Sequence, residues 1–161
     1  MRTADRILIF GGIALALFGM LYGLYYAIFA EHQALDKIGG SLATAFVEAA
    51  DRDSEKSEDA LSTYRQTKYN YVRKVDVHSH WIGLAMLMIV LGVVFDEVVF
   101  GERVRLVIAL AMLAGSVLFP LGVILQTTRA VSLASTLAIA GSGLVILAMA
   151  ATAVGLMRQS A

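Results

Sequence analysis

The sequence predicts an all-α integral membrane protein, a four-helix bundle with an extramembrane helical hairpin between its first and second spans. Of the 161 residues, 58% are hydrophobic and only 16% are charged, and the mean hydropathy is +0.73. Four apolar segments approach or exceed the roughly 20 residues that cross about 30 Å of hydrocarbon. We therefore expect residues 1–161 to form a single four-span membrane domain.

The predicted spans cover approximately residues 7–30, 81–99, 104–126 and 131–157. Arg2 and Arg6 precede the first span, as a basic segment precedes the core of a signal peptide. The apolar run of residues 7–30 is longer than the roughly 7–15 residues of such a core, so we expect a retained anchor. Gly19 and Gly23 give this span a Gly-x-x-x-Gly face, which permits close helix approach.

Residues 31–77 are predicted to form the helical hairpin. Its first arm carries an apolar stripe at three- and four-residue spacing, formed by Leu35, Ile38, Leu42, Phe46 and Ala49. A polar tip follows near Ser54, and Ser57 is the expected N-cap of the second arm. A rougher stripe continues along that arm, formed by Leu61, Tyr64, Tyr71 and Val75. We expect Gly39 and Gly40 to bend or break the first arm, because glycine weakens a helix interior.

Four spans place both chain ends on one side of the membrane, together with the short turn at residues 96–103. The short segments of that side contain five arginines. They are Arg2, Arg6, Arg103, Arg105 and Arg158. Basic residues in short segments favour the cytoplasmic side. We therefore expect cytoplasmic termini and an outside location for the 31–80 segment, in a bacterial inner membrane.

The third and fourth spans are expected to have mainly a structural role in helix packing. Pro120 is expected to kink the third span, with the Ser116 hydroxyl satisfying the freed carbonyl. The fourth span is rich in small residues, namely Ser132, Ala134, Ser135, Thr136, Ala138, Ala140, Gly141, Ser142 and Gly143. Such a surface packs closely against other helices, either inside the bundle, in other membrane subunits or in a second copy. Membrane lipid is the expected partner elsewhere, and a net charge of zero gives no case for nucleic acid.

All three histidines are predicted to lie at one membrane face, and the chain has no cysteine to compete as a soft-metal ligand. If the hairpin turns near Ser54, His32 lies opposite Asp76, and His80 lies one turn deeper in the membrane. The pairs His32–Asp36 and Asp76–His80 then share helix faces, because residues four apart do so. His78 points away from His80 in a regular helix and joins it only if the chain is extended before Trp81. Both geometries stay open.

Three interpretations of this cluster compete. The histidines could be ordinary interfacial residues with no cofactor bound. They could instead form a copper or zinc site, in which the metal ligands are His32, His80 and Asp76, with Asp36 or His78 completing the shell. Or His80 could be an axial ligand of a b-type haem, with His32, His78 or a residue of another subunit as its partner.

Two features of the neighbourhood favour the haem interpretation. Gly83 and Leu84 share the face of His80 one turn further along, where a small residue lets a flat macrocycle approach the helix. Arg73, Lys74 and Arg129 are suitably placed in the sequence to pair with haem propionates.

A family resemblance points the same way. The stretch His78-Ser79-His80-Trp81-Ile82-Gly83-Leu84, a following methionine-rich span and the later Leu118-Phe119-Pro120-Leu121-Gly122 resemble small membrane proteins distantly related to haem-copper oxidase subunit I. The resemblance implies a low-spin haem held by His80 or His78. Spans three and four contain no histidine, so the resemblance does not carry over the family's copper-and-haem centre or its oxygen or nitric oxide reduction.

We thus expect a haem- or metal-binding membrane protein that acts in electron transfer or as a subunit of a redox complex. The rival hypothesis is a non-catalytic accessory or scaffold subunit whose histidines are incidental. No span carries a charge near its centre, which argues against a transport pathway through one subunit. Walker, Gly-x-Ser-x-Gly and His-Glu-x-x-His patterns are missing too, so the sequence leaves open whether the protein is an enzyme.

Overall fold

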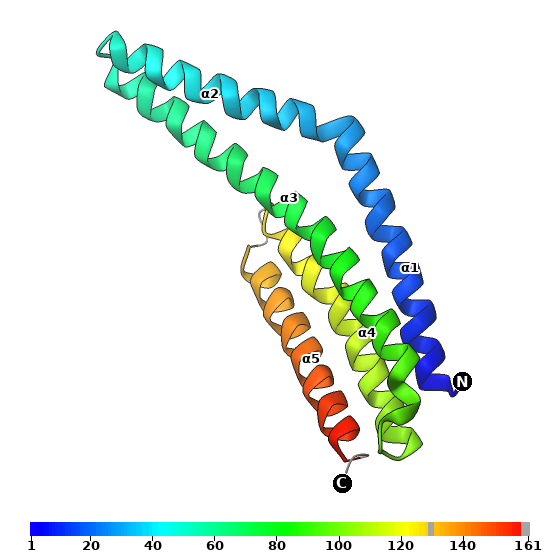
Figure 1. Cartoon of the computed structure of the whole chain (residues 1–161). Coiled ribbons are helices and arrows are strands. Elements are labelled where there is room, and N and C mark those ends of the chain that lie inside the picture. The colour runs from blue at the N-terminus through cyan, green and yellow to red at the C-terminus, as the bar shows by residue number, and fades with distance from the viewer. Residues whose placement is uncertain (129–130, 159–161) are drawn as a thin grey trace. The chain divides into compact units, whose positions relative to one another are not determined.

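The computed structural model describes residues 1–128 and 131–158, and every element in this part of the chain is helical. The order is α1 (Thr3–Tyr26), a π-helical turn η1 (Ala27–Glu31), α2 (His32–Ala50), α3 (Ser54–Val94), a 3₁₀ turn η2 (Phe95–Glu97), α4 (Glu102–Leu125) and α5 (Val131–Met157) (Figure 1). Four helical stretches are long and apolar enough to cross a membrane, namely Thr3–Ala50, Ser54–Glu97, Glu102–Leu125 and Ser132–Met157. The predicted all-α class is therefore confirmed. The first predicted span lies within its helical stretch, and each of the other three overruns its stretch by at most two residues.

The chain divides into two compact units, which are described separately. The span unit comprises Met1–Met20 and Asp76–Ala161, and the hairpin unit comprises Leu21–Val75. Helices α1 and α3 each contribute to both units.

Glycines bring α4 and α5 into close contact in the span unit. A methyl group on Gly122 would collide with the backbone of Ala138, and one on Gly141 would collide with the backbone of Phe119. Part of the predicted small-residue surface of the fourth span is thus used inside the chain. Ser132, Thr136 and Ala140 remain exposed on the same helix.

The span-unit portions of α1 and α3 approach closely through further glycines. A Cβ on Gly12 would lie 2.9 Å from the Ala85 carbonyl oxygen, and one on Gly92 would lie 3.1 Å from the Ile9 backbone nitrogen. Gly19 meets the Trp81 Cβ in the same way. The buried residues of α3 recur at three- and four-residue spacing. They are Val77, Trp81, Ala85, Met88 and Gly92. A single face of α3 therefore forms part of the core.

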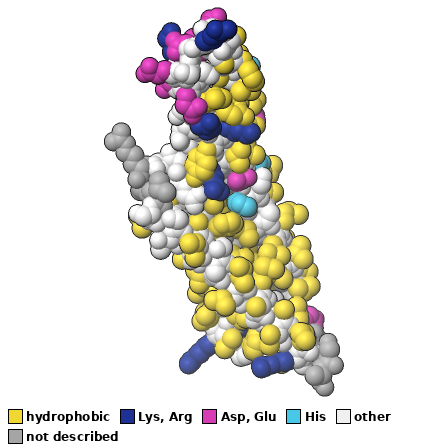
Figure 2. Space-filling view, turned by 90° about the vertical axis from the view of Figure 1, so that its left-hand side faces the viewer, with side chains coloured by type: hydrophobic (Ala, Val, Ile, Leu, Met, Phe, Trp, Pro, Cys, Tyr) yellow, Lys and Arg dark blue, Asp and Glu magenta, His cyan; other side chains and the backbone are white. Residues whose placement is uncertain are grey.

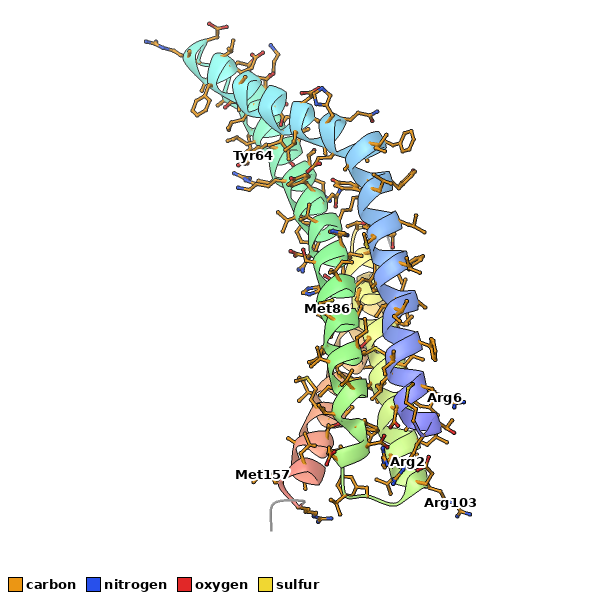
Figure 3. The ribbon with its side chains drawn as sticks, turned by 45° about the vertical axis from the view of Figure 1, so that its right-hand side comes forward. Arg2, Arg6, Tyr64, Met86, Arg103 and Met157 are labelled. Atoms are coloured by element: carbon orange, nitrogen blue, oxygen red, sulfur yellow. The ribbon has the colours of Figure 1, made fainter. Side chains whose placement is uncertain are left out.

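Large apolar side chains cover the outer surface of the span unit. Exposed examples occur on α1, α3 and α5, including Phe10, Leu17, Met86, Ile139 and Leu147. Hydrophobic side chains dominate the face of this unit seen in Figure 2. Arg2, Arg6, Arg103 and Met157 lie at one end of the unit (Figure 3), as four membrane crossings require. An apolar girdle with charges at its end fits insertion in a bilayer.

Pro120 lies inside α4 as predicted, but the Ser116 hydroxyl does not have the predicted role. Its Oγ is buried and has no hydrogen-bond partner among the described residues. Helix α4 nevertheless continues to Leu125.

The tip of the hairpin unit is a tight turn with caps on both sides. At the end of α2, the Asp53 amide donates to the Glu48 carbonyl and the Arg52 amide donates to the Ala49 carbonyl. Arg52 has a positive φ of 62°, which is typical of this type of helix ending. The Asp53 carboxylate then accepts from the Lys56 amide at 3.1 Å, so Asp53 caps α3.

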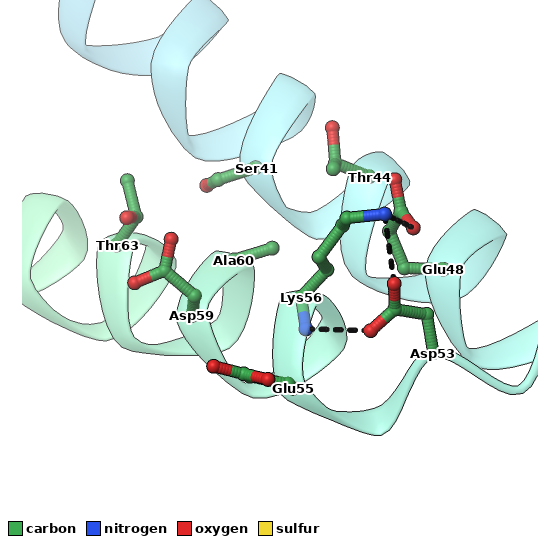
Figure 4. Close-up of a pocket in the computed structure, with 9 residues that line it drawn as sticks. All are labelled: Ser41, Thr44, Glu48, Asp53, Glu55, Lys56, Asp59, Ala60 and Thr63. Atoms are coloured by element: carbon green, nitrogen blue, oxygen red, sulfur yellow. Dashed lines mark hydrogen bonds and ion pairs between the residues drawn. The ribbon is translucent and has the colours of Figure 1, made fainter.

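The prediction that Ser57 caps the second arm is therefore wrong, and the cap lies four residues earlier, at Asp53. The Ser57 hydroxyl instead donates to the Ala45 carbonyl on the opposite arm, at 3.0 Å. Asp53 also forms an ion pair of 2.8 Å with the Lys56 ammonium, shown in Figure 4. This charged hydrogen bond keeps the pKa of Asp53 below its usual value of 3.8.

The predicted stripe of the first arm is only partly turned inward. Ala45 is buried and Ile38 and Leu42 are half-buried, whereas Phe46 is 69% exposed. Helix α2 runs unbroken through Gly39 and Gly40, so the expected break is wrong, and the irregular turn lies earlier at Ala27–Glu31. Tyr71 on the second arm donates to the Glu31 carboxylate at 3.1 Å, which ties the arms together at that turn.

Candidate functional site

His80 has the environment that best suits a ligand-binding residue. It lies in α3, is half-buried, and its ring centroid is 4.7 Å from that of Phe119 in α4. Within residues 1–128 and 131–158, its ring nitrogens have no hydrogen-bond partner. An imidazole with free nitrogens can coordinate iron.

The helix surface next to His80 is open. No neighbouring atom lies within 4 Å of the point where a Cβ on Gly83 would stand, apart from the local backbone of its own helix. Gly83 follows His80 by three residues and therefore lies on the same side of α3. The predicted small residue beside the candidate ligand thus leaves real space for a flat group.

His78 is engaged in the structure of the span unit. Its Nδ1 lies 2.8 Å from the Gly19 carbonyl oxygen, which is a hydrogen bond with the imidazole as donor. Because α3 is a regular helix from Ser54 to Val94, His78 and His80 are about 200° apart around its axis. The extended alternative for this segment is therefore wrong, and these two imidazoles cannot bind one iron from the same chain.

The contacts described for the other predicted site residues, apart from His80 and His78, do not involve His80. His32 is 87% exposed at the start of α2, with its Nε2 at 3.4 Å from the Asp36 carboxylate. The Arg73 guanidinium lies 5.2 Å from the centre of the Tyr69 ring, and the Lys74 ammonium lies 5.7 Å from that of Tyr26. Asp76 is half-buried in α3. Arg129 lies outside the described residues.

Among the described residues, no group of three or more histidine, aspartate or glutamate side chains is arranged to hold a metal ion. The predicted pair His32–Asp36 exists, but the fuller copper or zinc site has no support in this part of the chain.

A cluster of charged side chains at the other end of the span unit from His80 was not predicted from the sequence. Arg105 is 0% exposed and Asp5 is 1% exposed, and they form an ion pair of 2.9 Å. The same guanidinium nitrogen donates to the Phe95 carbonyl at 2.6 Å and to the Asp96 carboxylate at 3.3 Å. We call Asp5, Asp96 and Arg105 the end cluster.

The end cluster joins the start of α1, the turn after α3 and the start of α4. The Arg2 backbone amide also donates to the Asp5 carboxylate at 2.6 Å. Within the described residues, Nε and Nη1 of Arg105 are buried without a partner. A buried, paired arginine at a helix junction fixes the geometry of the junction, and it leaves the middle of the spans aliphatic.

The comparisons with known proteins add no identification. The chain matches no protein-family model, and neither a curated protein nor a solved structure is significantly similar to it. The resemblance to the relatives of haem-copper oxidase subunit I therefore stays a hypothesis that depends on the residues around His80.

Proposed function

We propose that this chain is a haem-binding membrane protein that acts in electron transfer, or as a redox subunit of a larger complex, in which His80 would hold the haem iron. The observation that carries the proposal is the half-buried imidazole of His80, which has no hydrogen-bond partner among the described residues, beside the open surface at Gly83. Haem supplies one-electron chemistry when it is bound, and the protein's part is to ligate and shield it.

The number of available ligands favours haem over a bare metal ion. A copper or zinc ion in a protein takes three or four side-chain ligands, whereas the porphyrin supplies four nitrogens and needs only one or two axial residues. In the span unit, His78 is bonded to Gly19 and points away, so His80 is the single imidazole left for iron.

The predicted role of Arg73 and Arg129 as partners of the haem propionates has less support. Arg73 is stacked on Tyr69 in the hairpin unit, and Arg129 lies outside the described residues. We therefore leave both out of the proposed haem site and base it on His80, Gly83 and Phe119.

The proposal is tested by a reduced-minus-oxidised visible spectrum of the purified protein. We expect a b-type spectrum in the wild type and its loss in Gly83→Leu, because a leucine fills the open surface without removing the ligand. Gly143→Leu is the matched control, since Gly143 of α5 also has nothing within 4 Å of its Cβ position. A colourless wild-type protein, or full haem in Gly83→Leu, would contradict the proposal.

An accessory or scaffold role is the second candidate, and one observation favours it. Phe46 and its neighbour Val47 are largely exposed on α2 in the hairpin unit, which lies in a polar part of the chain. Exposed large apolar side chains outside a membrane are typical of protein-docking surfaces. A colourless protein that loses a membrane partner on Phe46→Ser would favour this role.

A further inference from the structure

An apolar groove crosses one face of the span unit between α1, α3 and α4. Its volume is about 430 Å³ and its lining is almost wholly apolar. Helix α1 contributes Gly11, Ala14 and Phe18, and the opposite sides come from Trp81 of α3 and Leu113 of α4. Gly11 has no side chain and Ala14 carries only a methyl group, so α1 contributes little bulk to this part of the lining.

The position of the groove along the helices matches one leaflet of a bilayer. On α4 the lining runs from Leu113, the middle of the helix, to Leu121 near its end at Leu125. Eight residues of helix correspond to about 12 Å. One leaflet of hydrocarbon is about 15 Å thick. Trp81, at the outer end of the groove, is a residue type that favours the membrane–water interface.

From this geometry we infer that the groove binds one acyl chain of a phospholipid, which enters beside Trp81 and ends near Gly11 at the middle of the membrane. The inference rests on the membrane-spanning assignment of the helices and is independent of His80. Water is excluded as the occupant because an apolar lining offers it no hydrogen bonds. A helix about 10 Å wide and about 12 Å long fills more space than the roughly 430 Å³ of the groove.

The lining also favours an acyl chain over a ligand with a polar head inside the groove. No charged or hydrogen-bonding side chain other than the Trp81 indole lines it. Phe18 packs edge-on against Trp81 with ring centroids 4.8 Å apart, so aromatic rings form its outer end. The headgroup would then remain in the interfacial layer, and only the hydrocarbon chain would be held.

The single tryptophan of the chain makes this inference testable. Trp81 is the only tryptophan, lines the groove and is 2% exposed. We would reconstitute the whole protein in vesicles of phosphatidylcholine with brominated or unbrominated acyl chains and compare its fluorescence. The ratio between the two vesicle types cancels any quenching by a bound chromophore, so failure of the haem proposal leaves this test intact.

We expect strong bromine quenching in the wild type and at least a threefold smaller effect in Ala14→Phe, which fills the groove. Ile13→Phe is the matched control, because the adjacent Ile13 is 42% exposed and does not line the groove. Lipid extraction from purified protein should recover about one phospholipid per wild-type chain, and less from Ala14→Phe. Weak quenching in the wild type, equal quenching in both variants, or an isoprenoid quinone recovered in place of phospholipid would each overturn the inference.

Discussion

Two glycines of α5 show how neighbouring positions of one helix differ in their tolerance of a single methyl group. Gly141 lies against the backbone of Phe119, which cannot move aside as a flexible side chain could. Gly143 has nothing within 4 Å of its Cβ position. The first glycine is needed for packing, and the second only weakens its helix.

We predict that Gly141→Ala destabilises the protein by about 1–3 kcal/mol, because the methyl group overpacks the α4–α5 contact. Gly143→Ala should be neutral or stabilising by up to about 1 kcal/mol, because alanine favours the helix. Unfolding in mixed micelles measures both. Equal stabilities of the two variants would contradict the close contact.

Asp53 gives the hairpin a defined response to pH. Its pKa is lowered by the hydrogen bond and ion pair to Lys56, so the cap is fully present above the usual value of 3.8 and is lost as pH falls through the lower folded pKa. We predict that hydrogen exchange of the Lys56 amide quickens, relative to its intrinsic rate, across that range. Asp53→Asn keeps a capping oxygen and should abolish the pH dependence. A protection factor that does not change with pH would show that the cap is not formed.

At the scale of elements, the end cluster is a buried polar link between the start of α1 and the α3–α4 turn. Asp5 and Arg105 are 100 residues apart in the chain and are both buried. Removal of one partner leaves the other as a buried, uncompensated charge.

We predict that Asp5→Leu and Arg105→Met each destabilise the protein by about 3–5 kcal/mol, whereas the double variant loses much less than the sum. Arg103→Ala is the matched control, because Arg103 is exposed on the same helix and should change stability by no more than about 0.5 kcal/mol. A double-mutant cycle in unfolding free energy measures the coupling. Additive single losses would contradict the ion pair.

Helices were largely predictable from the sequence, and their ends were less so. The apolar runs and the α2 stripe predicted the helical stretches because their periodicity and length are local properties. The α3 N-cap was assigned to Ser57 instead of Asp53, since both residue types cap helices and only the chain path decides between them. The Asp5–Arg105 pair is not visible in any local pattern, because it depends on which helix ends meet.

Across the whole molecule, the helices of the span unit are aliphatic in their middles, and the end cluster and His80 lie away from those middles. Sequence reasoning identified His80 and the open Gly83 together, because residues three apart on a helix must share a side. It also grouped His32 and Asp36 correctly by four-residue spacing, and the His32 Nε2 lies 3.4 Å from the Asp36 carboxylate. It left two geometries for His78, because only the structure of the 76–80 segment decides whether that residue follows a helix or a strand.

The most direct measurement of the central claim is the haem-to-protein ratio of purified wild type, His80→Ala and His78→Ala by pyridine haemochrome assay. We predict haem in the wild type, its loss by at least tenfold in His80→Ala, and retention in His78→Ala, whose imidazole is bonded to Gly19 and points away from the site. Circular dichroism would verify that all three are folded. A wild-type protein without haem, or a His80→Ala variant that retains its haem, would contradict the account.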